Sequence, residues 1–426
     1  MEVLLSCFSS SPTSLALRLP TTHPRRLSLL RTTTSWRSPP PPTIRLSFAS
    51  ASPSPFDLSP PPIDHDLLDT MVGAGARASD DGTIESFGND SLALDAAFDG
   101  VVVTDLTHFG RVRVIGDDRL HFLHNQTTAN FECLREGEGC DTAFVTPTAR
   151  TVDIAHAWVM KNAVILLLSP TTYNSIIETL NKYIFFSDKV EVNDITKQTC
   201  FFSLFGPKSN QIMEALNLHD IIGQPYGTHR HYNVHQVDGF PVTISVGSVL
   251  SEDGFSFLLS PSSAASVWQT LIGLGAVPMG GNAWKRLRVL QGRPAPGSDL
   301  TNEFNVLEAG LWRAISLNKG CYKGQETISR LITYDGVKQH LWGIRLSGPA
   351  KPGSEITVDG KKVGKFTSYA LGRKDDEHVG LGYIRKQAGH CGAEVLVGGV
   401  AGKVIEVPFL CDPTRTQGAG SGDAKI

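Results

Sequence analysis

Acidic residues are missing from the first part of the chain. None occurs between Val3 and Phe56, a stretch that holds six arginines among many serines, threonines and prolines. This composition cannot bury a core, and it is typical of organelle transit peptides. We therefore expect residues 1–56 to be a transit peptide, addressed to the plastid because of its Ser, Thr and Pro content, with the mitochondrion as the alternative. An ordinary disordered tail is the other interpretation of this composition.

Long apolar runs and paired cysteines are also missing. The best apolar run, Ala163–Leu168, is far shorter than the roughly 18–20 residues that span a bilayer. The seven cysteines are scattered without a CxxC pair, which speaks against a disulfide framework or a cluster-holding pattern. His121 and His124 offer only two metal ligands. We expect a soluble protein with reduced thiols, no membrane partner and no stably bound metal.

An excess of basic charge is missing as well. The net charge of the whole chain is −3, and it becomes more negative once the arginine-rich first segment is removed. An acidic body argues against nucleic-acid binding, which rests on many contacts between basic residues and phosphates.

One local cluster departs from this acidic balance. Lys285, Arg286, Arg288 and Arg293 lie within nine residues of one another. They form either a solvated helix face or the wall of a pocket for a carboxylate-bearing ligand, because the guanidinium fork fits a carboxylate. Glu252, just before an expected strand, belongs either to a simple turn or to a site where a carboxylate accepts the N–H groups of a heterocycle.

Apolar periodicity divides the rest of the chain. Residues 57–90 are rich in Pro, Asp and Gly, and we expect a disordered linker. Residues 91–337 repeat the order strand, helix, strand, strand, helix, which indicates an α+β fold with two related lobes built around antiparallel sheets. Residues 338–411 carry short strands separated by glycine turns, as in a small β-barrel, and 412–426 would form a flexible tail.

The segment KGCYKGQE, residues 319–326, places one cysteine between two lysines. A thiol reacts as its thiolate, and the neighbouring charges of Lys319 and Lys323 would lower the pKa of Cys321. Gly320 lets the backbone pass close to a partner. The alternative is a packing residue, because free cysteines are commonly buried. No histidine lies close by in the sequence to act as a base.

This segment closely resembles the signature of the YgfZ family, K-G-C-Y-x-G-Q-E, whose members are folate-dependent proteins of iron–sulfur cluster synthesis or repair. Further segments resemble, in the same order, that family and its relative, the glycine-cleavage T-protein (an aminomethyltransferase). The resemblance implies a three-lobed fold in which the two lobes and the barrel surround a central channel that binds tetrahydrofolate.

The resemblance also implies roles for individual residues. Glu252 takes the position of a glutamate that binds the pteridine ring, and Arg288 that of an arginine that contacts folate. Asn130 takes the position of the catalytic aspartate of the T-protein. An amide cannot replace a carboxylate as a base, so aminomethyl transfer in the T-protein manner is not expected.

We therefore predict a tetrahydrofolate-dependent accessory protein in iron–sulfur cluster biogenesis, with folate and iron–sulfur assembly or client proteins as partners. In this hypothesis Cys321 acts as a thiolate at the rim of the folate channel. The other motif residues would tune or orient it: Lys319, Gly320, Tyr322, Lys323, Gly324, Gln325 and Glu326. The alternatives are a folate-dependent aminomethyl or methyl transferase, and a folate-binding scaffold in which Cys321 only packs.

Overall fold

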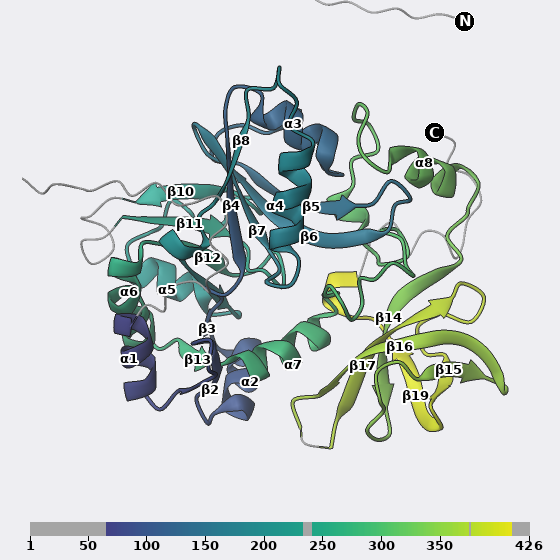
Figure 1. Ribbon diagram of the computed structural model, residues 1–426. Helices are drawn as coiled ribbons and strands as arrows, with labels where there is room; N and C mark the ends of the chain where they lie inside the picture. Colours follow the sequence, from purple (N-terminus) through teal and green to yellow (C-terminus); the bar gives the residue numbers. More distant parts are fainter. Residues whose placement is uncertain (1–64, 233–240, 375, 411–426) are drawn as a thin grey trace, which may run out of the picture. The chain divides into compact units, whose positions relative to one another are not determined.

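The structure, a computed structural model, describes residues 65–232, 241–374 and 376–410. By its internal contacts the chain divides into two units, Met1–Leu58 and Ser59–Ile426, and every described residue belongs to the second unit (Figure 1). The expected transit peptide and the expected flexible tail lie outside the described residues.

Eight helices lie within the described part of the chain, and none of them is long and apolar enough to cross a lipid bilayer. They are α1 (His65–Gly73), α2 (Asp90–Asp99), α3 (Arg119–Gln126), α4 (Tyr173–Lys182), α5 (Ser209–Ala215), α6 (Pro261–Gly273), α7 (Gly281–Gln291) and α8 (Gln325–Thr333).

The first lobe is built on an antiparallel sheet with the strand order β5-β6-β7-β4-β8. Its strands are β4 (Gly110–Ile115), β5 (Gly139–Val145), β6 (Thr151–Val159), β7 (Ala163–Leu168) and β8 (Glu191–Asp194). Strands β6 and β7 are buried almost throughout, and helices α3 and α4 pack on the sheet through buried residues such as Leu123 and Ile176. This lobe agrees with the α+β prediction.

The second lobe is built on a six-stranded sheet with the order β10-β11-β12-β9-β3-β13. Its strands are β3 (Val102–Asp105), β9 (Cys200–Phe205), β10 (His229–Tyr232), β11 (Val242–Val246), β12 (Phe255–Leu259) and β13 (Val277–Met279). Strand β3 precedes the first lobe in the sequence yet pairs with β9, and β13 pairs with β3 in parallel. The two lobes are therefore interleaved in sequence, which the simple repeat did not predict.

Residues 65–89 correct the prediction of a disordered linker over 57–90. They form α1 and a hairpin of β1 (Arg77–Ala78) and β2 (Ile84–Ser86). Leu67 and Met71, four residues apart on one face of α1, are buried in the core of the second lobe together with Ile84. A few apolar residues at helical spacing are enough for order when a larger core receives them, because tertiary packing supplies most helix stability.

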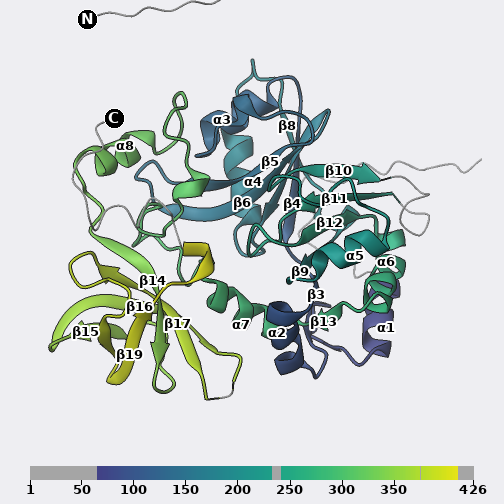
Figure 2. The ribbon, with the colours of Figure 1, turned by 180° about the vertical axis from the view of Figure 1, so that it is seen from behind.

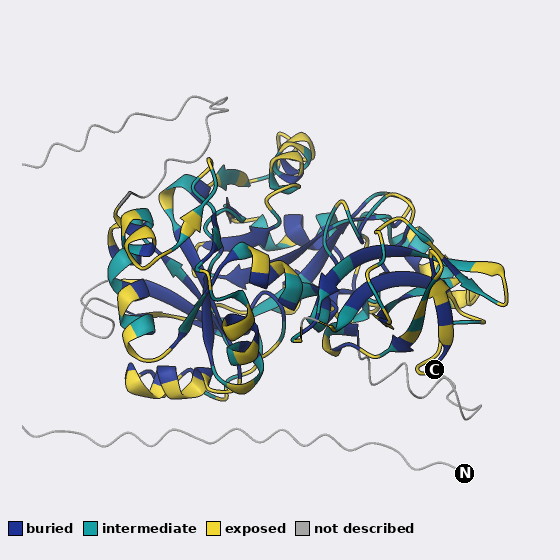
Figure 3. Cartoon of the chain, turned by 90° about the horizontal axis from the view of Figure 1, so that it is seen from below, coloured by how far each residue is buried: buried dark blue, intermediate teal, exposed yellow. Residues whose placement is uncertain are grey.

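The C-terminal part is a closed barrel of six strands in the order β14-β17-β16-β15-β18-β19, as predicted (Figure 2). The strands are β14 (Gln339–Leu346), β15 (Glu355–Val358), β16 (Lys361–Leu371), β17 (His378–Arg385), β18 (Glu394–Val397) and β19 (Val400–Ile405). Buried residues from all six strands pack together in the core of the barrel, and Figure 3 marks buried positions along these strands. Helix α7 packs against β16 and β17 and so connects the barrel to the lobes.

Asp299 links this barrel to the end of α7. Its side chain is fully buried, and one carboxylate oxygen accepts a hydrogen bond from Arg288 Nη1 at 2.7 Å. Both oxygens also accept from the hydroxyl of Ser368 on β16, at 2.7 and 2.9 Å, and Thr367 donates to one of them. Arg288 in turn donates to the carbonyl oxygen of Arg293 at 2.8 Å. One carboxylate therefore fixes both the barrel and the segment that follows α7.

We predict that Asp299→Asn lowers the free energy of unfolding by about 3–5 kcal/mol, because it removes the buried charge that pairs with Arg288, whose side chain is only 17% exposed. Chemical denaturation of the purified protein measures this. The matched control is Glu303→Gln, which breaks the exposed ion pair with Lys365 and should cost less than about 1 kcal/mol. Equal losses for the two variants would show that Asp299 is not the anchor of the barrel.

Candidate functional site

The larger of two neighbouring cavities has a volume of about 380 Å³. Its wall comes from β5 and β6, from the loops before β10 and before β12, and from two short 3-10 turns, η3 (Trp312–Ala314) and η4 (Pro408–Leu410). The first lobe, the second lobe and the segment after the barrel all contribute. The volume lies within the range of small-molecule sites, roughly 300–1,000 Å³.

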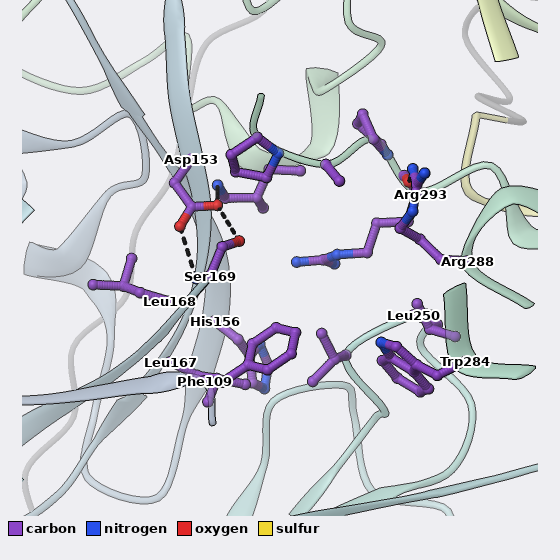
Figure 4. Close-up of a pocket in the computed structure, with 15 residues that line it drawn as sticks. Phe109, Asp153, His156, Leu167, Leu168, Ser169, Leu250, Trp284, Arg288 and Arg293 are labelled. Atoms are coloured by element: carbon purple, nitrogen blue, oxygen red, sulfur yellow. Dashed lines mark hydrogen bonds between the residues drawn. The ribbon is translucent and has the colours of Figure 1, made fainter. Parts of the chain in front are cut away.

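The smaller pocket, of about 60 Å³, lies beside the larger cavity and shares Ile154 and Arg293 with it. Asp153 and His156 enter it from β6, while Trp284 on α7, Arg288 and Arg293 stand on the opposite side (Figure 4). The two spaces are thus separated by side chains of a strand and of the turn after α7.

Asp141 on β5 is the most strongly held charge of the larger cavity. Its Oδ1 accepts hydrogen bonds from the hydroxyl of Tyr226 at 2.8 Å and from His156 Nδ1 at 3.0 Å, and its Oδ2 lies 3.9 Å from Arg293 Nη1. Burial alone would raise the pKa of Asp141, but the contacts with His156, Arg293 and Tyr226 hold it below its ordinary value. Asp141 is therefore an ionised acceptor at neutral pH.

Asp153 is the buried carboxylate of the smaller pocket. It accepts hydrogen bonds from the backbone N–H of Ile154 at 2.8 Å, from the N–H and hydroxyl of Ser169 at 2.8 and 2.7 Å, and from the hydroxyl of Thr172. Burial nevertheless raises the pKa of Asp153. Two donors to each oxygen hold the Asp153 carboxylate in a fixed position in the wall of the smaller pocket.

The predicted ligand-binding residues are not brought together. Glu252 lines the larger cavity but lies at its exposed rim, paired with Arg313. Arg288 lines the smaller pocket, where Asp299 and neighbouring oxygens engage its guanidinium group. Asn130 lines neither space. Their roles toward folate stay predictions.

The cysteine motif lies away from both spaces. Cys321 is exposed and lines neither of them. The Lys319 ammonium is buried at the end of α3, where it donates to the carbonyl oxygens of His124, Thr127 (2.8 Å) and Ala129 (2.6 Å). Its hydrogen bonds therefore satisfy one carbonyl group of the last turn of α3, where a helix leaves such groups without partners, and two carbonyl groups of the segment that follows.

The remaining motif residues shape the turn into α8. Gly324 has a φ of +85°, and a Cβ there would lie 2.9 Å from the carbonyl oxygen of Thr146, so only glycine fits. Lys323 lies over the ring of Tyr183, 5.0 Å from its centre. Glu326 pairs with Arg330 one helical turn later. These contacts give the motif a structural role and direct its charged side chains to groups other than the thiol.

The last three motif positions are Tyr322, Gln325 and Gly320. Tyr322 is partly buried and packs on a hydrophobic core, with the Lys319 ammonium 4.6 Å from the centre of its ring. Gln325 is the first residue of α8. A Cβ at Gly320 would lie 3.6 Å from His124 Nε2, so a histidine far away in sequence lies beside the loop.

Sequence reasoning missed the residues that hold the larger cavity together. Asp141, His156 and Tyr226 come from β5, β6 and the loop before β10, so their positions in the sequence form no recognisable spacing. Arg293, from the basic cluster, and Glu252 were the signals in the sequence for this site, and both line the larger cavity. Within the described ranges, no group of three or more His, Cys, Asp or Glu residues is arranged to hold a metal ion.

Comparison with known proteins shows similarity over most of the chain. Residues 93–319 match the GCVT N-terminal domain. The Arabidopsis thaliana protein "Putative transferase At1g60990, chloroplastic" is 65% identical over 368 residues, which cover 86% of this chain and 84% of that protein. The aminomethyltransferase of Rubrobacter xylanophilus is 27% identical over 310 residues, covering 72% of this chain and 82% of the relative.

The fold is also found among solved structures. The glycine cleavage system aminomethyltransferase T of Bartonella henselae superimposes with a TM-score of 0.70 and 18% sequence identity. The match covers 81% of this chain and 97% of that chain. It confirms the predicted T-protein-like architecture, including the C-terminal barrel.

The two motif lysines should respond differently to substitution. Lys319→Met should lower the free energy of unfolding by about 3 kcal/mol, because three buried carbonyl groups lose a charged donor. Lys323→Met should change it by less than about 1 kcal/mol, because its contact with Tyr183 lies near the surface. Thermal and chemical unfolding of both variants measures this difference. A Lys319→Met variant as stable as the wild type would refute the structural role of Lys319.

Proposed function

Because the chain belongs to the GCVT N-terminal domain family of aminomethyltransferase-like proteins, we propose that it binds tetrahydrofolate, or a one-carbon derivative, in the larger cavity. The observation that carries this proposal is the cavity itself. It combines a volume of about 380 Å³ with an ionised carboxylate, Asp141, and a guanidinium group, Arg293, on its inner wall. A pterin ring offers hydrogen-bond donors and acceptors, and its glutamyl tail offers carboxylates that suit arginine.

The second part of the proposal is a role as accessory protein in iron–sulfur cluster biogenesis or repair. The KGCYKGQE signature supports it, and so does the position of the thiol. Cys321 is exposed, on a loop that Lys319 anchors to α3. An exposed thiol outside the ligand cavity can reach another protein. One thiolate cannot hold a cluster, so iron–sulfur assembly or client proteins would supply the other ligands.

The site of action in this proposal is the plastid. The composition of residues 1–56 supports it, and the Arabidopsis relative carries the word chloroplastic in its name. The mitochondrion is the alternative.

A second candidate function, transfer of an aminomethyl or methyl group to tetrahydrofolate, is favoured by Asp153. The resemblance put an asparagine, Asn130, where the T-protein has its catalytic aspartate, and this spoke against a transferase. Asp153 supplies a buried carboxylate in the smaller pocket, across from Arg293, and burial raises its pKa. A carboxyl group in such a pocket can exchange a proton with an amine during transfer.

The accessory role predicts that Cys321→Ala fails to restore the activity of iron–sulfur enzymes in cells that lack the protein. The matched control is Cys391→Ala, which removes another exposed thiol on the barrel side of the chain and should restore activity fully. Activities of iron–sulfur enzymes and the amount of each variant are measured in the same extracts. If Cys321→Ala restored the iron–sulfur enzyme activities fully, the thiol of Cys321 would have no part in the accessory function.

The transferase candidate is tested with purified protein, tetrahydrofolate and an S-aminomethyl thiol. Transfer would break the C–S bond, form methylenetetrahydrofolate and release the thiol and ammonia. The accessory role predicts no ammonia release above the uncatalysed rate. A transferase predicts turnover that Asp153→Asn lowers by about 100-fold and Cys321→Ala leaves unchanged.

A further inference from the structure

The carboxylate of Asp141 uses only one of its two oxygens for hydrogen bonds to described residues. Oδ1 accepts from Tyr226, which is partly buried, and from His156, which is fully buried. Because a carboxylate is an acceptor only, His156 must present a protonated Nδ1 to it. Oδ2 makes no hydrogen bond within the described residues, and Asp141 lines the larger cavity. One rigidly held acceptor is therefore available to a ligand.

Arg293 supplies a donor beside this acceptor. Its Nη1 lies 3.9 Å from Asp141 Oδ2, which is an ion-pair distance but too long for a hydrogen bond. The guanidinium group lies 5.3 Å from the ring centre of Phe409, and its carbon skeleton is mostly buried. The structure gives this guanidinium no hydrogen bond to any described residue, although the group lines both spaces. A guanidinium with free N–H groups and a neighbouring free carboxylate oxygen form one donor–acceptor pair.

Such a pair complements an N–H group next to a carbonyl group in the same ring. The N–H donates to the carboxylate oxygen while the carbonyl oxygen accepts from the guanidinium, and the two contacts run side by side. In a pterin this arrangement is the lactam edge of the 2-amino-4-oxopyrimidine ring, formed by N3–H and the carbonyl group at C4. Both protein groups carry full charges, which strengthens each hydrogen bond.

The geometry points to Asp141 and Arg293 as the residues that recognise the lactam edge of the pterin, with Tyr226 and His156 as residues that position Asp141. This inference rests on the proposed folate binding and assigns the recognition to Asp141 instead of Glu252. Glu252 is 61% exposed and already paired with Arg313, which is 59% exposed. Water competes for the hydrogen bonds of an exposed carboxylate, so Glu252 is the weaker candidate for recognising the pterin ring.

The test compares two ligands that differ only at this edge, 5-formyltetrahydrofolate and its 4-amino counterpart. The 4-amino ring carries an amino donor at C4 and no hydrogen on N3, so donor and acceptor are exchanged. By calorimetry, the wild type should bind the 4-oxo ligand at least about tenfold more tightly than the 4-amino ligand. Asp141→Asn should lower this preference to less than about threefold, because the amide can turn either group toward the ligand.

Glu252→Gln is the matched control, and it should keep the preference of the wild type. Wild-type protein that binds neither ligand would refute the proposed folate binding itself. Wild-type protein that binds both equally would refute only the assignment of the lactam edge, and this comparison needs no variant to fold. If the preference for the 4-oxo ligand remained in Asp141→Asn but was lost in Glu252→Gln, Glu252 and not Asp141 would be the residue that recognises the lactam edge.

Discussion

The buried ion pair between Arg288 and Asp299 is the contact on which the candidate site depends. The carboxylate of Asp299 accepts hydrogen bonds from the hydroxyl groups of Ser368 and Thr367 on the barrel. Arg288 donates a hydrogen bond to the backbone carbonyl oxygen of Arg293. The turn after α7 is thereby fixed between the lobes and the barrel, and the side chain of Arg293 is held in the wall of both spaces. The resemblance assigns Arg288 to folate binding, but in this structure its guanidinium group fixes the backbone at Arg293. A planar guanidinium group can do this because it donates hydrogen bonds to several oxygen atoms at once.

Two carboxylates then divide the chemistry of the site. Asp141 is kept ionised by His156, Arg293 and Tyr226, whereas burial raises the pKa of Asp153. The exposed thiol of Cys321 lies apart from both. The proposed folate cavity and the proposed reactive thiol therefore lie at different places on the molecule, which suits the proposal of a folate bound inside and a partner met at the surface.

Local sequence patterns predicted the helices and strands, but the residues of the candidate site are brought together only by the three-dimensional fold. Strand alternation and glycine turns predicted the barrel, and the strand–helix order predicted two α+β lobes. The insertion of β3 beside β9 was not predictable, because nothing in a single strand specifies a partner about one hundred residues away. The linker prediction was wrong for residues 65–89, because a few apolar side chains pack into a core formed by later segments. Lys319 shows the same limit: proximity in sequence placed it beside the thiol, but its ammonium group turns to carbonyl groups at and just after the end of α3.

The central claim is that a folate occupies the larger cavity with its pterin ring against Asp141 and Arg293. A crystal structure of the full chain with 5-formyltetrahydrofolate tests it most directly. The account predicts the pterin N3 within hydrogen-bonding distance of Asp141 Oδ2 and the C4 carbonyl oxygen facing Arg293. A ligand bound with its ring against Glu252, or bound outside the cavity, would contradict it.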